Sequence, residues 1–172
     1  MLLEEVLRPL SRQPKTWASP PWRSALPYTG RMPLQLRVPV DIERRLSTLG
    51  DRLAAAFPDL EFAYVFGSAG TERSTPGSDV DLAIYVSESA DPHASRLEVC
   101  RLAAHHLGTD AIDIVLLNTA PVALAGRVLT SRRVIVDQRP FVRHAYESRT
   151  ARLFQDFRLR EHRLLAERYA RG

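Results

Sequence analysis

The chain has 172 residues, of which 45% are hydrophobic and 26% charged, as is typical of a soluble globular protein with one domain. Its single cysteine, Cys100, excludes an intramolecular disulfide, and no apolar run approaches the roughly 20 residues of a membrane span. The net charge of +4 is uneven, because residues 139–172 hold nine basic and four acidic side chains. The N-terminus lacks the apolar core of a signal peptide, so we expect a cytoplasmic protein without membrane contact.

Six prolines between residues 11 and 40 interrupt any helical or strand period in that stretch. We therefore expect residues 1–38 to be an extended or partly disordered arm and residues 39–172 to be the domain. Met32 stands just before the first regular pattern, so an alternative is that part of the arm is untranslated.

From Asp41 onward, apolar residues recur at helical spacing in some segments and form short runs in others. Asp41 is expected to cap the first helix, and Asp91 with Pro92 to open the second. The expected helices cover residues 41–57, 92–107, 119–129 and 140–170, and the expected strands cover residues 61–66, 80–87, 111–117 and 132–137. This alternation of strands and helices predicts an α/β domain.

Two of the expected helices carry apolar positions that predict which side is buried. In the second helix these positions are Leu97, Cys100, Ala104 and Leu107. Residues 140–170 form one long helix or two in series, with a broken stripe at Ala145, Tyr146, Arg149, Leu153, Phe157 and Leu164. The arginines of this last segment form either a face for a partner or the solvated side of a packed helix.

Two aspartates, Asp79 and Asp81, stand at the start of an otherwise apolar strand. Residues two apart in a strand point to the same face, so the two carboxylates project together with Ala83 and Tyr85, while the other face is apolar enough for a core. Such a pair is often only a solvated strand edge. Without a basic neighbour, however, it also suits a hard divalent cation such as Mg²⁺ or Mn²⁺.

A third aspartate, Asp113, lies between two isoleucines on the following strand, where an unpaired buried carboxylate would be costly. If strands 80–87 and 111–117 are neighbours, the three carboxylates converge. Such a triad fits two-metal phosphoryl chemistry, in which the ions bind the attacking and leaving oxygens.

The turn after strand 61–66 supplies a second part of the predicted site. Gly67 and Ser68 end the strand, and Gly70 follows. Glycine lets backbone amides approach a phosphate closely, and the serine hydroxyl adds a hydrogen-bond donor. A Gly-Ser pair alone is a common turn, but its combination with the three aspartates, in this order, favours a triphosphate site.

Gly67–Ser68, ten intervening residues and then Asp79-x-Asp81 resemble the signature of the nucleotidyltransferase superfamily. The segments DAIDIVLLNTAPVALAGRVL and LFQDFRL are similar to one branch, the minimal nucleotidyltransferase (MNT) domains that are paired with HEPN-domain proteins. The resemblance covers residues 40–165. It implies the α+β nucleotidyltransferase fold, with a small mixed sheet flanked by helices and a long C-terminal helix.

The turn departs from the pattern of that family. Gly70 stands where the family has Ala, and Glu72 stands where it has Gly, although the total spacing to Asp79 is kept. A carboxylate at position 72 would repel a triphosphate, so the departure implies weakened activity.

MNT proteins of this kind act as antitoxins that bind a HEPN toxin RNase and transfer AMP from ATP to one of its tyrosines. The resemblance therefore implies ATP as substrate, two Mg²⁺ ions (with Mn²⁺ as an alternative), a hetero-oligomer with the toxin, and no direct binding of nucleic acid. The implied catalytic and metal-binding residues are Asp79, Asp81 and Asp113, and the implied nucleotide-binding residues are Gly67, Ser68 and Ser78.

Two other functions remain open from the sequence. A small-molecule nucleotidyltransferase, such as those that adenylylate aminoglycosides, would share the core, but the short stretch after Asp113 favours a protein acceptor. A catalytically weak MNT module that masks its partner by binding alone is favoured by the altered turn and opposed by the intact aspartates.

Overall fold

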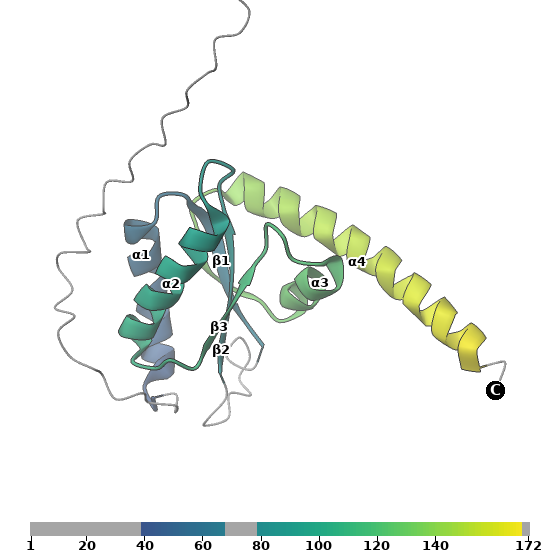
Figure 1. Cartoon of the computed structure of the whole chain (residues 1–172), viewed down its shortest axis with the longest axis horizontal. Coiled ribbons are helices and arrows are strands. Elements are labelled where there is room, and N and C mark those ends of the chain that lie inside the picture. Colours follow the sequence, from purple (N-terminus) through teal and green to yellow (C-terminus); the bar gives the residue numbers. More distant parts are fainter. Residues whose placement is uncertain (1–38, 68–78, 170–172) are drawn as a thin grey trace, which may run out of the picture. The chain divides into compact units, whose positions relative to one another are not determined.

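Within the described residues, a four-stranded sheet separates two pairs of helices (Figure 1). The computed structural model describes residues 39–67 and 79–169, so the expectations for the arm lie outside the described residues. The strands are β1 (Leu60–Phe66), β2 (Val80–Val86), β3 (Ile112–Leu116) and β4 (Arg133–Asp137). The helices are α1 (Ile42–Ala56), α2 (Pro92–Leu107), α3 (Val122–Thr130) and α4 (Pro140–Tyr169).

The sheet is mixed, with the strand order β3–β2–β1–β4. β1 is antiparallel to both β2 and β4, whereas β2 and β3 are parallel and are joined by the crossover helix α2. The expected small mixed sheet, flanked by helices and followed by a long C-terminal helix, is confirmed. Each expected element is present with ends that differ by three residues or fewer, and the last segment is one helix.

Helices α1 and α2 cover one face of the sheet and form the main core with it (Figure 1). In β2, Val80, Leu82, Ile84 and Val86 point into this core, as their alternation predicts. The second helix begins as expected, since the Asp91 carboxylate accepts hydrogen bonds from the amides of His93 and Ala94 at 2.9 and 3.2 Å.

Two expectations for these helices hold only in part, since Asp41 does stand at the N-cap and Leu107 and Cys100 do face the core. The Asp41 side chain makes no cap hydrogen bond, because Arg45 one turn later donates from Nε to its carboxylate at 3.0 Å. The buried face of α2 consists of Val99, Ala103 and Leu107, while Leu97 is 70% exposed. Periodicity places apolar residues on a helix, but the orientation of the helix against its neighbours decides which of them are covered.

Helices α3 and α4 cover the other face and form a second core (Figure 1). Ala83 of β2 is fully buried there, beside Phe62 and Tyr64 of β1. Tyr85 stacks on Phe62 with ring centroids 4.8 Å apart, and Tyr146 of α4 packs against both rings. The face of β2 that begins with Asp81 therefore continues into an aromatic core.

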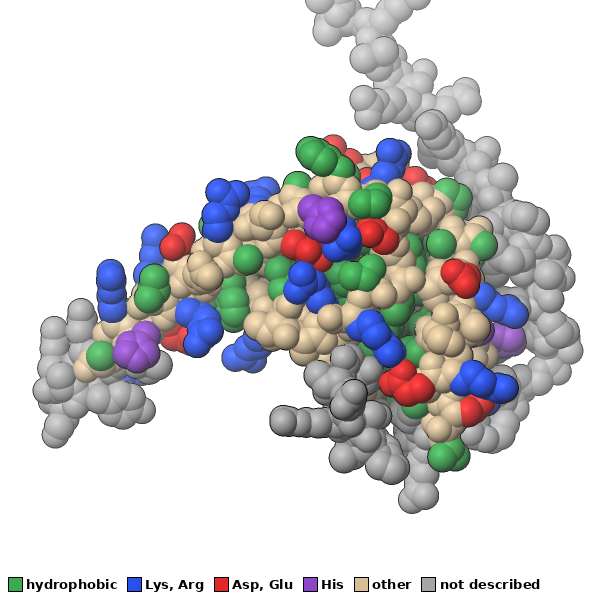
Figure 2. All heavy atoms as spheres, turned by 180° about the vertical axis from the view of Figure 1, so that it is seen from behind, with side chains coloured by type: hydrophobic (Ala, Val, Ile, Leu, Met, Phe, Trp, Pro, Cys, Tyr) green, Lys and Arg blue, Asp and Glu red, His purple; other side chains and the backbone are tan. Residues whose placement is uncertain are grey.

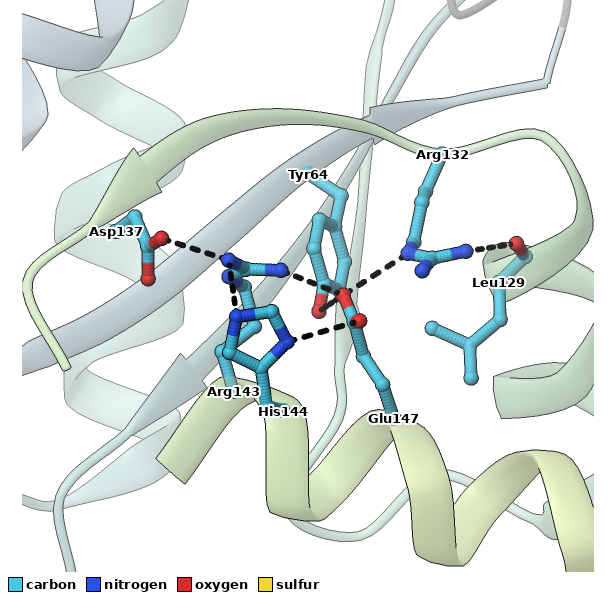
Figure 3. Close-up of polar contacts among 7 residues, drawn as sticks. All are labelled: Tyr64, Leu129, Arg132, Asp137, Arg143, His144 and Glu147. Carbon is cyan, nitrogen blue, oxygen red and sulfur yellow. Dashed lines mark hydrogen bonds and ion pairs between the residues drawn. The ribbon is translucent and has the colours of Figure 1, made fainter. Parts of the chain in front are cut away.

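A polar network attaches α4 to the rest of the domain (Figure 3). The Glu147 carboxylate, whose side chain is 13% exposed, accepts hydrogen bonds from Tyr64 Oη at 2.8 Å, Arg132 Nε at 3.0 Å and Arg143 Nη1 at 3.1 Å. Arg143 also donates to Asp137 at 2.8 Å. One carboxylate of α4 thus joins β1 to the segment between α3 and β4.

The stripe expected on α4 is mostly exposed, since Ala145 and Arg149 also face solvent and only Tyr146 of the expected set packs against the second core. Tyr146 is half-buried and Thr150 is buried, but Leu153, Phe157 and Leu164 are 43%, 38% and 67% exposed. No described helix combines the length and the apolar character that a membrane span requires.

Candidate active site

The turn that follows β1 begins at a glycine with an unusual backbone conformation. Gly67 has a φ of +67°, in the left-handed region that other residues rarely adopt. Its amide donates a hydrogen bond to Ser131 Oγ at 3.2 Å. A Cβ atom at this position would collide with Oδ2 of Asp81. The turn therefore approaches the carboxylate closely because residue 67 has no side chain.

Asp81 and Asp113 lie side by side because β2 and β3 are parallel neighbours. Asp81 pairs with Phe66 of β1 on one side and with Asp113 of β3 on the other. The amide of Val80 donates to the carbonyl of Ala111 at 2.9 Å, which joins the starts of the two strands. The condition that these strands are neighbours is therefore met, and the register brings two of the three aspartates into one row.

Asp79 lies two residues before Asp81 and outside the strand. Asp79 and Asp113 are exposed, and Asp81 is half-buried at the edge of the second core. Since Ala83 continues the Asp81 face into that core, α3 and α4 cover the same side of the sheet on which Asp81 lies.

Burial and two neighbouring carboxylates make the Asp81 carboxylate costly to ionise. Burial raises the pKa of Asp81 above its ordinary value, and the nearby charges of Asp113 and then Asp79 raise it further. Within residues 39–67 and 79–169, no arginine or histidine forms an ion pair with any of the three. Negative charge at this place is thus uncompensated by the described part of the protein.

The donor set fits a hard divalent cation by its chemistry. Carboxylate oxygens on adjacent strands, without a cationic partner, are the ligands that Mg²⁺ and Mn²⁺ prefer. As the described side chains stand, no group of three acidic, histidine or cysteine residues is close enough to hold an ion. The chemistry therefore supports a metal site, whose full set of ligands stays a prediction.

Several predicted site residues fall outside the described residues. They are Ser68 and Ser78, which were expected to bind the nucleotide, and Gly70 and Glu72, where the turn departs from the family pattern. Of the predicted nucleotide-binding residues, Gly67 is described, at the end of β1 and against Asp81.

Sequence reasoning missed Ser131. This residue follows α3 and lies 64 positions after Gly67, yet its hydroxyl accepts the hydrogen bond from the Gly67 amide. The adjacent Arg132 donates to Glu147 of α4, so the turn, the segment after α3 and α4 are connected through two consecutive residues. Nothing in the local sequence distinguishes Ser131 from an ordinary serine at a helix end.

We expect Gly67→Ala to destabilise the protein by about 1–3 kcal/mol, because a side chain at positive φ is strained and its Cβ would displace Asp81. Urea unfolding measures the change. Because loss of the Asp81 charge changes stability by itself, the double variant Gly67→Ala/Asp81→Ala is compared with Asp81→Ala, and this difference should contain only the part of the loss that comes from the backbone. Equal losses from Gly67→Ala in the wild type and in Asp81→Ala would contradict the close approach.

The sequence profile described as polymerase beta, nucleotidyltransferase matches residues 51–140, which is just over half of the chain. The chain belongs to this nucleotidyltransferase family. The matched range contains Gly67 and all three aspartates and ends where α4 begins. The sequence matches none of the curated proteins with which it was compared.

Solved structures share the fold of this nucleotidyltransferase. A chain of the MntA–HepT toxin–antitoxin crystal structure has 21% identity and a TM-score of 0.54, over 73% of this chain and 97% of that chain. A chain of a toxin–antitoxin structure with AMP-PNP has 22% identity and a TM-score of 0.57, over 73% and 96%. A complex of tri-AMPylated Shewanella oneidensis HEPN toxin with MNT antitoxin gives 20% identity and a TM-score of 0.55, over 73% and 96%.

Proposed function

We propose that this nucleotidyltransferase is an antitoxin that transfers AMP from ATP to a tyrosine of a cognate HEPN toxin RNase and thereby neutralises it. The observation that carries the proposal is the row formed by Asp81 and Asp113 on parallel strands, with the Gly67 turn against Asp81. A protein acceptor is supported by the fold, which is shared with chains of solved toxin–antitoxin complexes.

The proposed reaction joins the acceptor tyrosine to the α-phosphate of ATP. The tyrosine hydroxyl gives its proton to solvent, its oxygen forms a bond to the α-phosphorus, and the bond from that phosphorus to the bridging oxygen of the β-phosphate breaks, so that pyrophosphate leaves with the electron pair of that bond. Two Mg²⁺ ions, when bound, would neutralise the phosphate charge and favour the deprotonated hydroxyl.

The residues of this chain would divide these tasks by their positions. Asp79 and Asp81 would hold the metal that accompanies the triphosphate, and Asp113 would join Asp81 in holding the metal beside the acceptor. Gly67 would let backbone amides of the turn approach the β- and γ-phosphates, with Ser68 and Ser78 as further donors.

A labelling assay tests the proposal. The protein is incubated with ATP labelled at the α-phosphate, Mg²⁺ and the cognate HEPN toxin, and the label is mapped by mass spectrometry. We expect label on a tyrosine of the toxin, and no label with Asp79→Asn/Asp81→Asn. If this double variant neutralises the toxin as well as the wild type does, the protein acts by binding alone and the proposed reaction is wrong.

A further inference from the structure

The second half of α4 carries an apolar stripe that nothing in the described residues covers. At about 100° per residue, Leu153, Phe157 and Leu164 fall within about 40° of one another around the helix. Tyr146 and Thr150 occupy the same side one to two turns earlier, where they pack against the domain. The stripe that fixes α4 to the sheet thus continues past the domain as an exposed surface.

A basic flank runs along one edge of this stripe. Arg149, Arg152, Arg160 and Arg163 fall within about 80° of one another on the same geometry, with Asp156 among them. None of the four arginines forms an ion pair with any described residue. Figure 2 shows basic side chains spread along the surface of this helix. An apolar row beside unpaired arginines is suited to a partner that is apolar at its centre and acidic at its rim.

We propose that the stripe and its basic flank dock the HEPN toxin through a helical face with an acidic rim. This inference rests on the proposed function for the identity of the partner. Leu153 and Leu164 are separated by about 16 Å along the helix axis, a length that suits contact with one or two partner helices. Phe157 follows Leu153 by four residues and Leu164 follows Phe157 by seven, spacings that keep the three anchors on one side of the helix.

The charges on this chain argue against two other occupants. A second copy would bring the same unpaired arginines to the contact. The segment 1–31 carries five basic and two acidic residues, so it has the same sign as the flank. An acidic partner removes this repulsion and supplies the missing counter-charges.

The position of α4 relates the docking surface to the candidate active site. α4 packs on the sheet face that carries Asp81 and Asp113. Glu147 of α4 accepts a hydrogen bond from Arg132, and the adjacent Ser131 accepts one from the Gly67 amide. A protein bound along α4 is therefore on the side of the sheet from which its tyrosine can reach the aspartates.

Binding measurements on matched variants test the surface. The full-length protein is titrated with the HEPN toxin by calorimetry, and ATP binding is measured on the same samples. We expect Phe157→Ser/Leu164→Ser to weaken toxin binding by about tenfold or more, as for loss of two interface anchors, with unchanged affinity for ATP. The control His162→Ser, which removes an exposed side chain on the side of α4 that faces away from both the stripe and the basic flank, should bind like the wild type.

A charge-reversed pair provides a second test that leaves the apolar residues in place. Arg160→Glu/Arg163→Glu should weaken binding and reduce its dependence on salt, while Arg158→Glu, on the far side of the helix, should change little. Circular dichroism of each variant checks that the helix content is kept.

The outcomes separate this surface from the proposed reaction. If both α4 double variants bind the toxin as tightly as the wild type does, the proposed docking surface is wrong. The labelling assay then still tests AMP transfer independently. If the α4 variants bind the toxin more weakly but the wild type transfers no AMP, the docking surface is supported and the proposed reaction is wrong. A third outcome is that the variants keep their affinity for the toxin but lose self-association, measured by light scattering, or binding of a single-stranded RNA. The stripe would then bind a second copy of the chain or RNA, and the proposal would be wrong.

Discussion

Asp81→Asn is expected to abolish AMP transfer and, at the same time, to make the metal-free protein more stable. In the proposed reaction Asp81 holds a metal, and the loss of a metal ligand that supplies several kcal/mol of transition-state stabilisation corresponds to a rate decrease of about 10³-fold or more. The gain in stability has the opposite origin, because the Asp81 carboxylate is half-buried between the charges of Asp113 and Asp79. Removal of one of two like charges that face each other on adjacent strands should raise the free energy of unfolding by about 0.5–1 kcal/mol.

The two effects can be measured on the same protein. In EDTA at neutral pH, urea unfolding should give a higher free energy of unfolding for Asp81→Asn than for the wild type. The pKa of Asp81 is raised in the folded state, so the wild type gains stability as the pH falls through that pKa, and the difference between the two proteins shrinks. Addition of Mg²⁺ should stabilise the wild type and leave the variant unchanged.

Asp51→Asn is the matched control. It also removes one carboxylate, but from an exposed position of α1. It should keep AMP transfer, and its stability should not rise as that of Asp81→Asn does. An Asp81→Asn protein that retains transfer, or that loses stability in EDTA, would show that Asp81 is a structural residue and not part of a metal site.

Glu147→Gln is expected to produce the largest loss of stability, about 2–4 kcal/mol at pH 7. The Glu147 carboxylate is nearly buried and receives hydrogen bonds from Tyr64, Arg132 and Arg143 (Figure 3). Replacement by an amide leaves Arg143 without one of its two carboxylate partners in a site where it is itself 13% exposed. Removal of one member of such a partly buried ion network leaves the remaining charges uncompensated.

The stability loss should depend on pH in a defined direction. Although burial raises the pKa of Glu147, hydrogen bonds from Arg132, Tyr64 and Arg143 lower it from 4.5 to about 2. A carboxyl with a depressed folded pKa stabilises the protein above its unfolded pKa and ceases to do so as the pH falls through the folded value. The difference between wild type and Glu147→Gln should therefore be complete at pH 6–7 and shrink between about pH 4.5 and pH 2.

Urea unfolding at a series of pH values measures this difference, and Glu161→Gln on the exposed part of α4 is the control. A double-mutant cycle with Tyr64→Phe isolates the hydrogen bond between α4 and β1. A pH-independent loss in Glu147→Gln would mean that the network contributes through packing and not through charge.

Much of the candidate site was readable from local signals. The spacing between the Gly67 turn and the Asp79-x-Asp81 pair lies within one hairpin-like unit of β1 and β2, where strand alternation and turn chemistry act over a few residues. The boundaries of the helices followed from apolar periodicity and from residues such as Pro92 and Gly108 at their ends. These signals depend on the backbone within one or two turns, so they predict the elements without information on the rest of the fold.

Other features depended on segments that are distant in the chain. Asp113 joins Asp81 only because α2 carries β3 back beside β2 in a parallel register, and Ser131 reaches Gly67 only because α3 ends beside β1. The same holds for errors such as Leu97, which has helical apolar spacing but faces solvent because the neighbouring elements cover another side of α2.

Sequence therefore decided the elements, the turn and the types of residue that suit phosphate and metal chemistry, since each rests on short-range backbone preferences. Tertiary structure decided which carboxylates meet, which side of α4 is covered, and how Glu147 connects three segments of the chain. The physical reason is that burial and pairing are set by long-range packing, in which the free energy of a contact depends on neighbours that no local pattern specifies.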